Sequence, residues 1–316
     1  VEAFDWPEHM IRSIDYNPLV AIPVAASNRI TRIAFHRGRI LVATSAGDLF
    51  QVDPDFPEQP HALLDGPLAG GSPIWGLALD GDAVWLGSEF RLFRLEPDSG
   101  TPREYTPQHR LRQPDRMTVD GEGRLWLASS TDEGMVRFEP RTGRSDLFRP
   151  DSMDPLGLLS NRVLSLAVDP RGDLWVGLLR GGSQRLRLSE PGMDRFRAGH
   201  AGSQSFCAMS PLDATRLLVS LCGAGLGELD LASGGWTDLT PRIARHLASG
   251  AETLTAHALL RDAGGALWIP TTREGLLRWD PDRDQMTVLP LLAPDGSVVP
   301  SPYLTHIFED AAGRIW

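Results

Sequence analysis

The chain has 316 residues, 41% of them hydrophobic, and 41 acidic side chains against 31 basic ones give a formal net charge of -10. Because the basic residues are scattered, DNA and other polyanions are repelled on average, so no nucleic-acid partner is expected. No apolar run reaches the roughly 18 residues of a membrane helix, so this segment is not expected to insert into a membrane. The 32 Gly and 25 Pro indicate many turns, as in all-β proteins.

The first residues, "VEAFDWPEHM", lack the charged and apolar regions of a signal peptide. The last residues, "AAGRIW", stop on a Trp in the middle of a recurring pattern. We therefore expect the chain to be a segment of a longer protein.

A short strand-like motif recurs seven times, with a Trp or a Leu as its anchor. Roughly 41 to 50 residues separate successive anchors. Before each anchor comes an alternating apolar segment such as "VLSLAVD", and after it come segments such as "GMVRFEP" and "RSDLF", which also read as strands. The anchors are Leu41, Trp85, Trp126, Trp175, Leu218, Trp268 and Trp316.

This period, with four strands in each unit, predicts an all-β fold: a seven-bladed β-propeller of four-stranded antiparallel blades, with residues 1–316 as one domain. "VEAFDWPEHMIRSI" at the N-terminus resembles the third and fourth strands of a unit, and "YLTHIFEDAAGRIW" supplies the first and second. We expect residues 1–25 and 302–316 to form one blade and close the ring, which removes exposed sheet edges. The alternative is a slice of a longer linear array.

Turns of the type "DPRG" (169–172) and "DGEG" (120–123) join the first and second strands. Their Asp can accept hydrogen bonds from its own turn, and their Gly can take the left-handed conformation of a short hairpin. The stretch "DPDRD" (280–284) opens like a calcium loop, but Gln285 and Leu291 replace the required Gly and Glu. A solvated turn is favoured there, and no metal is expected.

The Trp anchors have two interpretations: a ladder for stacking sugars or cofactors, or a core between blades. Their constant place in the second strand favours the core. Trp75 differs, because it lies in a first strand whose counterparts carry smaller side chains. It is therefore the aromatic residue that we treat as a functional candidate.

The two cysteines, Cys207 and Cys222, lie in the first and second strands of the fifth repeat. If Leu212 pairs with Arg216, Cys222 lies opposite Phe206 and the two thiols point to opposite faces. A disulfide would then need a bulge. We expect reduced, buried thiols, which leave the compartment open.

Motifs for nucleophilic catalysis, phosphate binding and zinc binding are absent from the sequence, so neither a cofactor nor catalysis is expected. A propeller does gather the starts of its first strands at one mouth of a central channel, where distant residues converge. We expect a small polar ligand there, saccharides being one class; the alternative for the histidines is a hydrogen-bonded channel lining. The candidate ligand-binding residues are Asn28, Trp75, Arg116, Asn161, His257 and His306.

The unit "DPLGLLSNRVLSLAVDPRGDLWVGL" (154–178) resembles the two-component regulator propeller repeat. The resemblance extends over nearly the whole chain with uneven fidelity, since the fifth repeat lacks both the Trp and the D-x-x-G turn. The residues that match the pattern are Asp154, Pro155, Ser160, Asn161, Val163, Asp169, Gly172, Leu174, Trp175 and Gly177.

The resemblance implies a non-catalytic, periplasmic sensor region of a histidine kinase, hybrid two-component protein or diguanylate cyclase. It also implies further domains, a membrane helix and homodimerisation in the parent receptor, but it transfers no fixed ligand residues. One alternative is an enzyme similar to streptogramin B lyase, a seven-bladed propeller that needs a His and an acidic group near a metal. Because His257 and His306 lack an acidic companion in the same strand, the sensor is favoured. A scaffold propeller that binds only proteins is a further alternative.

Overall fold

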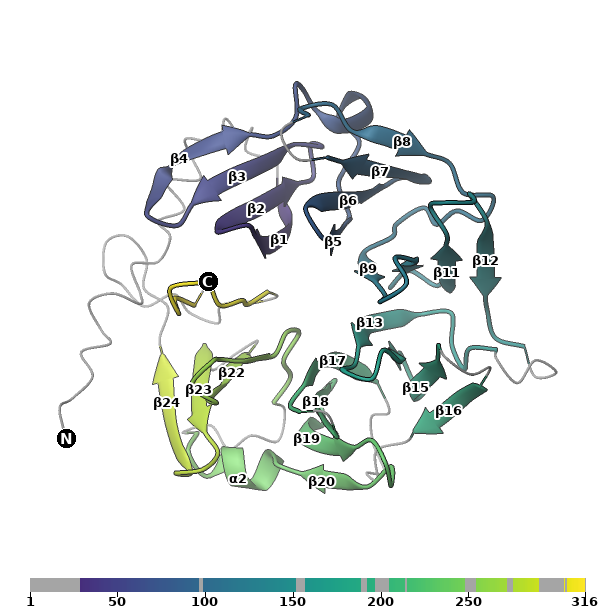
Figure 1. Cartoon of the computed structure of the whole chain (residues 1–316). Helices are drawn as coiled ribbons and strands as arrows, with labels where there is room; N and C mark the ends of the chain where they lie inside the picture. Colours follow the sequence, from purple (N-terminus) through teal and green to yellow (C-terminus); the bar gives the residue numbers. More distant parts are fainter. Residues whose placement is uncertain are drawn as a thin grey trace.

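The computed structural model describes residues 29–96, 99–151, 157–188, 192–196, 205–213, 215–247, 254–271, 275–289, 304 and 306–315. These residues form six four-stranded antiparallel sheets, which follow one another around a ring in chain order (Figure 1). The first strand of each sheet is innermost, and the described contacts between neighbouring sheets run largely through these strands.

The first three sheets contain β1 (Ile30–His36), β2 (Arg39–Thr44), β3 (Leu49–Asp53), β4 (Phe56–Ala62); β5 (Gly76–Asp80), β6 (Ala83–Ser88), β7 (Arg91–Leu95), β8 (Arg103–Tyr105); and β9 (Arg116–Val119), β10 (Leu125–Ala128), β11 (Met135–Phe138), β12 (Ser145–Phe148). The last three contain β13 (Val163–Val168), β14 (Leu174–Leu178), β15 (Gly182–Arg187), β16 (Gly192–Phe196); β17 (Phe206–Pro211), β18 (Arg216–Leu221), β19 (Gly225–Asp230), β20 (Trp236–Asp238); and β21 (Leu260–Arg261), β22 (Leu267–Pro270), β23 (Leu276–Asp280), β24 (Gln285–Leu289). Two short helical segments lie in the connections between sheets: η1 (Leu68–Gly70) between the first and second sheets, and α2 (Thr240–Ala244) between the fifth and sixth. No helix in the described part of the chain is long and apolar enough to cross a membrane.

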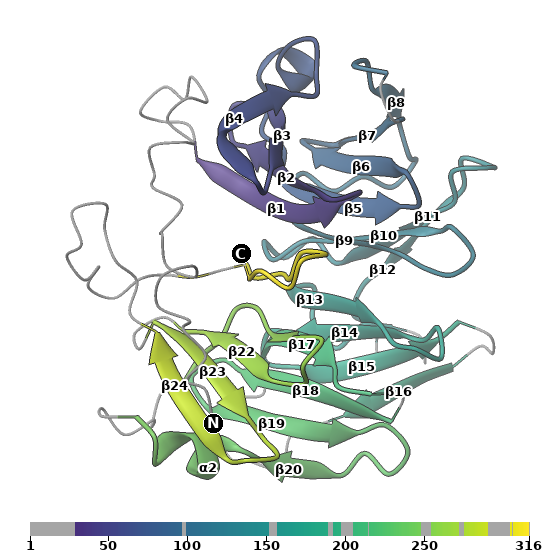
Figure 2. The same cartoon turned by 60° about the vertical axis from the view of Figure 1, so that its left-hand side comes forward.

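The all-β propeller is confirmed, but the prediction of seven blades is wrong, because the described residues form six. A blade needs strands that pair along their length, whereas the described residues of the C-terminal segment form an isolated bridge between Glu309 and Ile315. This segment lies between the first and sixth sheets (Figure 2), where Phe308 stacks on Phe35 with ring centroids 5.8 Å apart. Residues 1–25, the other half of the expected closing blade, lie outside the described residues.

The D-x-x-G turns have the predicted structure. In the fourth sheet Asp169 Oδ1 accepts the backbone amides of Arg171 and Asp173 at 2.8 and 3.0 Å, and Gly172 has a φ of 88°. The other carboxylate oxygen of Asp169 accepts Nε1 of the buried Trp175 at 2.9 Å. Each such Asp therefore ties its turn to the core. The same bond joins Asp80 to Trp85, Asp120 to Trp126 and Asp262 to Trp268.

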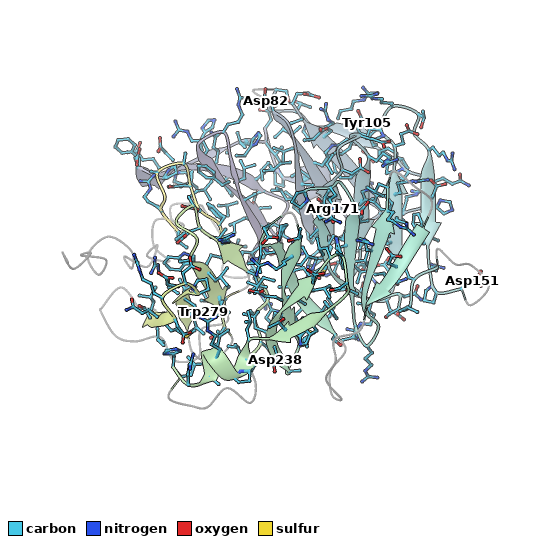
Figure 3. All side chains as sticks on the ribbon, turned by 60° about the horizontal axis from the view of Figure 1, so that its bottom comes forward. Asp82, Tyr105, Asp151, Arg171, Asp238 and Trp279 are labelled. Carbon is cyan, nitrogen blue, oxygen red and sulfur yellow. A yellow bond between two sulfur atoms is a disulfide. The ribbon has the colours of Figure 1, made fainter. Side chains whose placement is uncertain are left out.

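The Trp anchors that the structure describes are fully buried between sheets, which confirms the core interpretation for them: Trp85, Trp126, Trp175 and Trp268. Trp316 lies outside the described residues. Trp175 is fully buried and packs against Phe206, Leu217 and Val219 of the fifth sheet. The guanidinium of Arg185 also lies over the Trp175 ring, 5.7 Å from its centroid. A similar cluster joins the fifth and sixth sheets, whose labelled residues Asp238 and Trp279 appear in Figure 3.

The Gly two positions after the Trp anchor lets the next sheet approach closely. A Cβ atom on Gly177 would lie 2.9 Å from the carbonyl oxygen of Phe206, which belongs to β17 of the following sheet. Real Cβ atoms do not come this close to backbone oxygens. The spacing between β14 and β17 therefore depends on this missing side chain.

Cys207 and Cys222 form a disulfide, with Cα atoms 5.3 Å apart, so the prediction of reduced thiols is wrong. The register between β17 and β18 shifts between Phe206 and Ala208, which makes Cys207 the extra residue of a β-bulge. The bulge breaks the alternation that would have pointed the two thiols apart. It is the very irregularity that the disulfide required.

Candidate functional site

The innermost strands carry irregularities at one level of the propeller. The register shifts at Thr31 in β1, Leu164 in β13 and Cys207 in β17, always one residue before the regular ladder begins. A bulge bends its strand and redirects neighbouring side chains. Arg32 in β1 and Arg116 in β9 both pair with the residue two positions after the anchor of their sheet, so they occupy equivalent places near the axis.

The side chains of these two arginines meet at one backbone carbonyl. Arg32 Nη2 donates a hydrogen bond to the carbonyl oxygen of Asp115, and Arg116 Nη1 donates to the same oxygen at 3.0 Å. Arg32 belongs to the first sheet and Asp115 to the segment before β9 of the third, so this contact passes the second sheet on the axial side. Arg116 Nε reaches onward to the carbonyl oxygen of Leu164 in the fourth sheet at 2.5 Å.

The two guanidinium groups repel each other. Since both donate to one oxygen, their donor nitrogens lie no more than about 6 Å apart, and at an effective dielectric constant of about 20 the repulsion is about 3 kcal/mol. Burial and then the Arg116 charge lower the pKa of Arg32, Asp115 raises it, and the net result is a pKa of about 10. Arg32 therefore remains charged at neutral pH.

Asp115 offsets only part of this positive charge. Its carboxylate lies 3.2 Å from Arg116 Nη1 and has a side-chain exposure of 8%. The same carboxylate accepts the backbone amide of Ser130 at 2.9 Å and its hydroxyl at 2.6 Å. Two guanidinium charges thus face one carboxylate that is already hydrogen bonded.

Two imidazoles lie within electrostatic reach of the arginines. His306 belongs to the C-terminal segment, and burial, followed by the charges of Arg32 and Arg116, lowers its pKa to about 4. His257 precedes β21, and burial followed by the Arg116 charge lowers its pKa as well. Both imidazoles are therefore neutral at pH 7. We call Arg32, Asp115, Arg116, His257 and His306 the axial cluster.

Residues 157–179 match the protein family described as the two component regulator propeller. This stretch, which contains β13 and β14, carries one two-component regulator propeller repeat. Comparison with curated protein sequences gives no match.

Solved structures share the propeller fold of this chain. The extracellular domain of BT4673, described as a one component system of B. thetaiotaomicron, has a TM-score of 0.72 and 14% identity over 93% of this chain and 37% of that one. The extracellular domain of BT3049, described as a hybrid two component system of the same organism, has a TM-score of 0.68 and 16% identity over 91% and 38%. Virginiamycin B lyase from Staphylococcus aureus has a TM-score of 0.62 and 15% identity over 82% and 83%. The chain thus spans little more than a third of the two extracellular domains, and at these identities the likeness shows the fold.

Among the predicted site residues, His257 and His306 both lie within electrostatic reach of Arg116. Trp75 is half-buried at the place in the second sheet that corresponds to the bulge residue Thr31, and its amide donates to the Gly87 carbonyl at 2.8 Å. Its place in the sheet thus puts it at the same level of the propeller.

Asn161 and Asn28 are not part of the described axial cluster. The Asn161 carbonyl accepts the Gly134 amide at 2.8 Å, which places Asn161 between the third and fourth sheets, beside the start of β11. Its buried Oδ1 has no hydrogen-bond partner among the described residues. Asn28 lies outside the described residues.

Sequence reasoning missed Arg32 and Asp115. Arg116 was found, but Arg32 stands nine residues before its anchor Leu41, whereas Arg116 stands ten before Trp126. The turn between the first two strands differs in length, so alignment on the anchors puts the two arginines out of register. An alignment on the strand pairing, in which each arginine lies opposite the residue two positions after its anchor, would have matched Arg32 with Arg116.

The "DPDRD" turn uses its carboxylates within the protein. Asp280 Oδ1 accepts the amides of Asp282 and Arg283 at 3.1 and 3.0 Å. Asp284 accepts Nε of Arg242 at 2.7 Å. Over the residues that the structure describes, no group of three His, Cys, Asp or Glu side chains has the proximity that a metal ion needs.

Proposed function

We propose that this chain is a non-catalytic, extracytoplasmic sensor propeller of a signal-transduction protein of the histidine kinase or diguanylate cyclase type, and that the axial cluster binds its ligand. One observation carries the proposal: Arg32 of the first sheet and Arg116 of the third meet on the carbonyl of Asp115, on the axial side of the second sheet. A small molecule at this point contacts several sheets at once. Its binding energy can therefore change how the blades sit relative to one another.

The extracytoplasmic location has two supports. The Cys207–Cys222 disulfide is typical of oxidising compartments such as the periplasm and the cell exterior. The two B. thetaiotaomicron structures with the same fold are extracellular domains of proteins described as signalling systems. A periplasmic sensor region agrees with both.

The propeller fold is also that of virginiamycin B lyase, which keeps an enzyme as the second candidate. Such chemistry needs a His and an acidic group beside a metal. In the axial cluster, however, Arg32 and Arg116 repel a divalent cation, and the Asp115 carboxylate is already hydrogen bonded. The charge distribution thus favours a sensor.

Thermal-shift screening tests the proposal with monosaccharides, oligosaccharides, amino acids and organic acids. A ligand that binds the folded state raises the melting temperature. The rise should be lost in Arg116→Gln and kept in Arg91→Gln, a control that removes an exposed arginine paired with Glu104 at the ring's outer side. A rise of the same size in all three proteins would refute the axial site.

The enzyme and scaffold alternatives have their own outcomes. Metal-dependent turnover of a streptogramin-like cyclic ester, abolished by His257→Ala or His306→Ala, would overturn the sensor. If no small molecule stabilises the wild-type chain but a protein partner does, the scaffold function is supported in place of the sensor function.

A further inference from the structure

Building on the proposed function, we infer that the axial cluster selects an anionic ligand and that the ligand class is a small carboxylate. The carboxylate oxygens would lie between the guanidinium groups of Arg32 and Arg116. The inference rests on how these groups are held, on which donors remain and on the charge balance around them.

Backbone carbonyl oxygens hold both guanidinium groups in place. Arg32 Nη1 donates to the carbonyl of Thr31 at 2.5 Å and its Nη2 to that of Asp115, while Arg116 Nε donates to that of Leu164 at 2.5 Å. Carbonyl oxygens orient a guanidinium without neutralising its charge. The two cations are thus fixed side by side before any ligand arrives, which lowers the entropy cost of binding.

The remaining donors are available to a ligand. Among the described residues, Arg32 Nε and Arg116 Nη2 take part in no hydrogen bond with another side chain or carbonyl. The Arg116 side chain is 32% exposed, so solvent and small solutes reach it. Guanidinium groups with free donors bind the two oxygens of a carboxylate well, because both groups are planar.

The charge balance favours a monoanion. Arg32 and Arg116 exceed Asp115 by one positive charge, and both imidazoles are neutral at pH 7. A carboxylate cancels that excess and relieves the repulsion between the arginines. A neutral molecule leaves the repulsion in place, and a cation increases it.

His306 provides an internal reporter. The charges that lower its pKa, after burial, belong to Arg32 of β1 and Arg116 of β9. A carboxylate bound between the two arginines screens both charges, and the imidazolium becomes easier to form. Carboxylate binding should therefore raise the pKa of His306 above about 4.

The test is an NMR titration of the imidazole signals of the whole chain, with the His306 signal identified by its loss in His306→Gln. The probes are sodium lactate and the neutral lactamide, which differ only in replacement of the carboxylate by an amide, with sodium phosphate as a third probe, all at constant ionic strength. Lactate should shift the His306 signal saturably and raise its pKa, and lactamide should not. In Arg116→Gln the apparent affinity for lactate should fall about tenfold or more, and in Arg91→Gln it should not change.

Several outcomes would overturn the inference. If lactamide shifts the signal as strongly as lactate, or if phosphate does so and lactate does not, the carboxylate class is wrong while a ligand site at the axis stands. If none of the three probes shifts the His306 signal, but a compound from the thermal-shift screen loses its stabilising effect in Arg116→Gln, the carboxylate inference is wrong and the proposed sensor function is kept. Because Arg116→Gln could alter packing, Arg116→Lys is tested beside it: it keeps the charge, and it should retain part of the lactate affinity.

Discussion

Replacing Trp175 with Ala should destabilise the propeller more than any other single truncation we discuss. The ring is fully buried between the fourth and fifth sheets, and truncating a buried aromatic side chain to Ala typically costs about 3 to 5 kcal/mol. The substitution also removes the 2.9 Å hydrogen bond from Trp175 Nε1 to Asp169, a residue that is only 4% exposed. Loss of this bond should lower the free energy of unfolding by about 1 kcal/mol more. We therefore expect a loss of about 5 kcal/mol, comparable to the whole stability of many domains.

Urea unfolding followed by circular dichroism measures this loss. Trp175→Phe is the matched control, because it keeps most of the apolar ring and removes the hydrogen bond to Asp169, and it should cost about 1 to 2 kcal/mol. It also keeps the test informative if the Ala variant does not fold. Trp75→Ala, at a half-buried side chain, should cost about 1 kcal/mol or less. Equal losses for Trp175→Ala and Trp75→Ala would refute the separation between a core Trp and an axial one.

Three further predictions use stability as the readout. The folded-state pKa of His306, about 4, lies below the unfolded value of 6.5, so the unfolded chain binds more protons and stability falls as the pH drops from 6.5 towards 4. Relative to His306→Gln, the wild type should lose about 2 kcal/mol between pH 7 and pH 5, and an equal pH dependence in both would contradict the buried imidazole. Reduction of Cys207–Cys222 should lower the free energy of unfolding by about 3 kcal/mol, whereas Cys207→Ser with Cys222→Ser should make the protein insensitive to the reductant. Gly177→Ala should cost about 1 to 3 kcal/mol through the contact with Phe206, and no change in the urea midpoint would show that β17 shifts freely.

Local features were predictable from the sequence because neighbouring residues determine them. The alternation in "VLSLAVD" and the turn at Asp169 depend on a few adjacent residues, and the structure has both as expected. The number of blades depends on whether distant ends pair along their length, which alternation cannot show. The error at Cys207 had a similar origin, since one inserted residue in β17 reversed the expected direction of its side chain.

The axial cluster was only partly predictable for a different reason. The ring geometry brings first strands together, which suggested Arg116, His257 and His306 as neighbours, and the Arg116 charge does act on both imidazoles. Yet the Arg32 side chain crosses from the first sheet to a carbonyl of the third, and such a contact depends on side-chain direction and channel width. Neither the side-chain direction nor the channel width can be predicted from the sequence of a single repeat.

The repeat signature itself is a structural unit. Opposite each Trp of β6, β10, β14 and β22 the third strand carries an Arg, whereas opposite the anchors Leu41 and Leu218 it carries Gln51 and Glu228. The sheets that lose the Trp thus lose its Arg as well, and no Asp–Trp bond is found in them over the described residues. Asp, Trp and Arg change together because they pack on one another.

A signature that builds the core between blades says little about the ligand. Under the proposed function, ligand selectivity depends instead on the first-strand position that faces the residue two places after the anchor, where the side chains differ in charge and size from sheet to sheet. Those residues are Arg32, Gly76, Arg116, Ser165 and Ala208. The room at this position differs between sheets: a Cβ on Gly76 would lie 2.1 Å from the Pro114 carbonyl oxygen, whereas the first and third sheets hold an arginine there. Propellers with the same repeat should therefore share their Asp–Trp turns and differ in ligand through these inner positions.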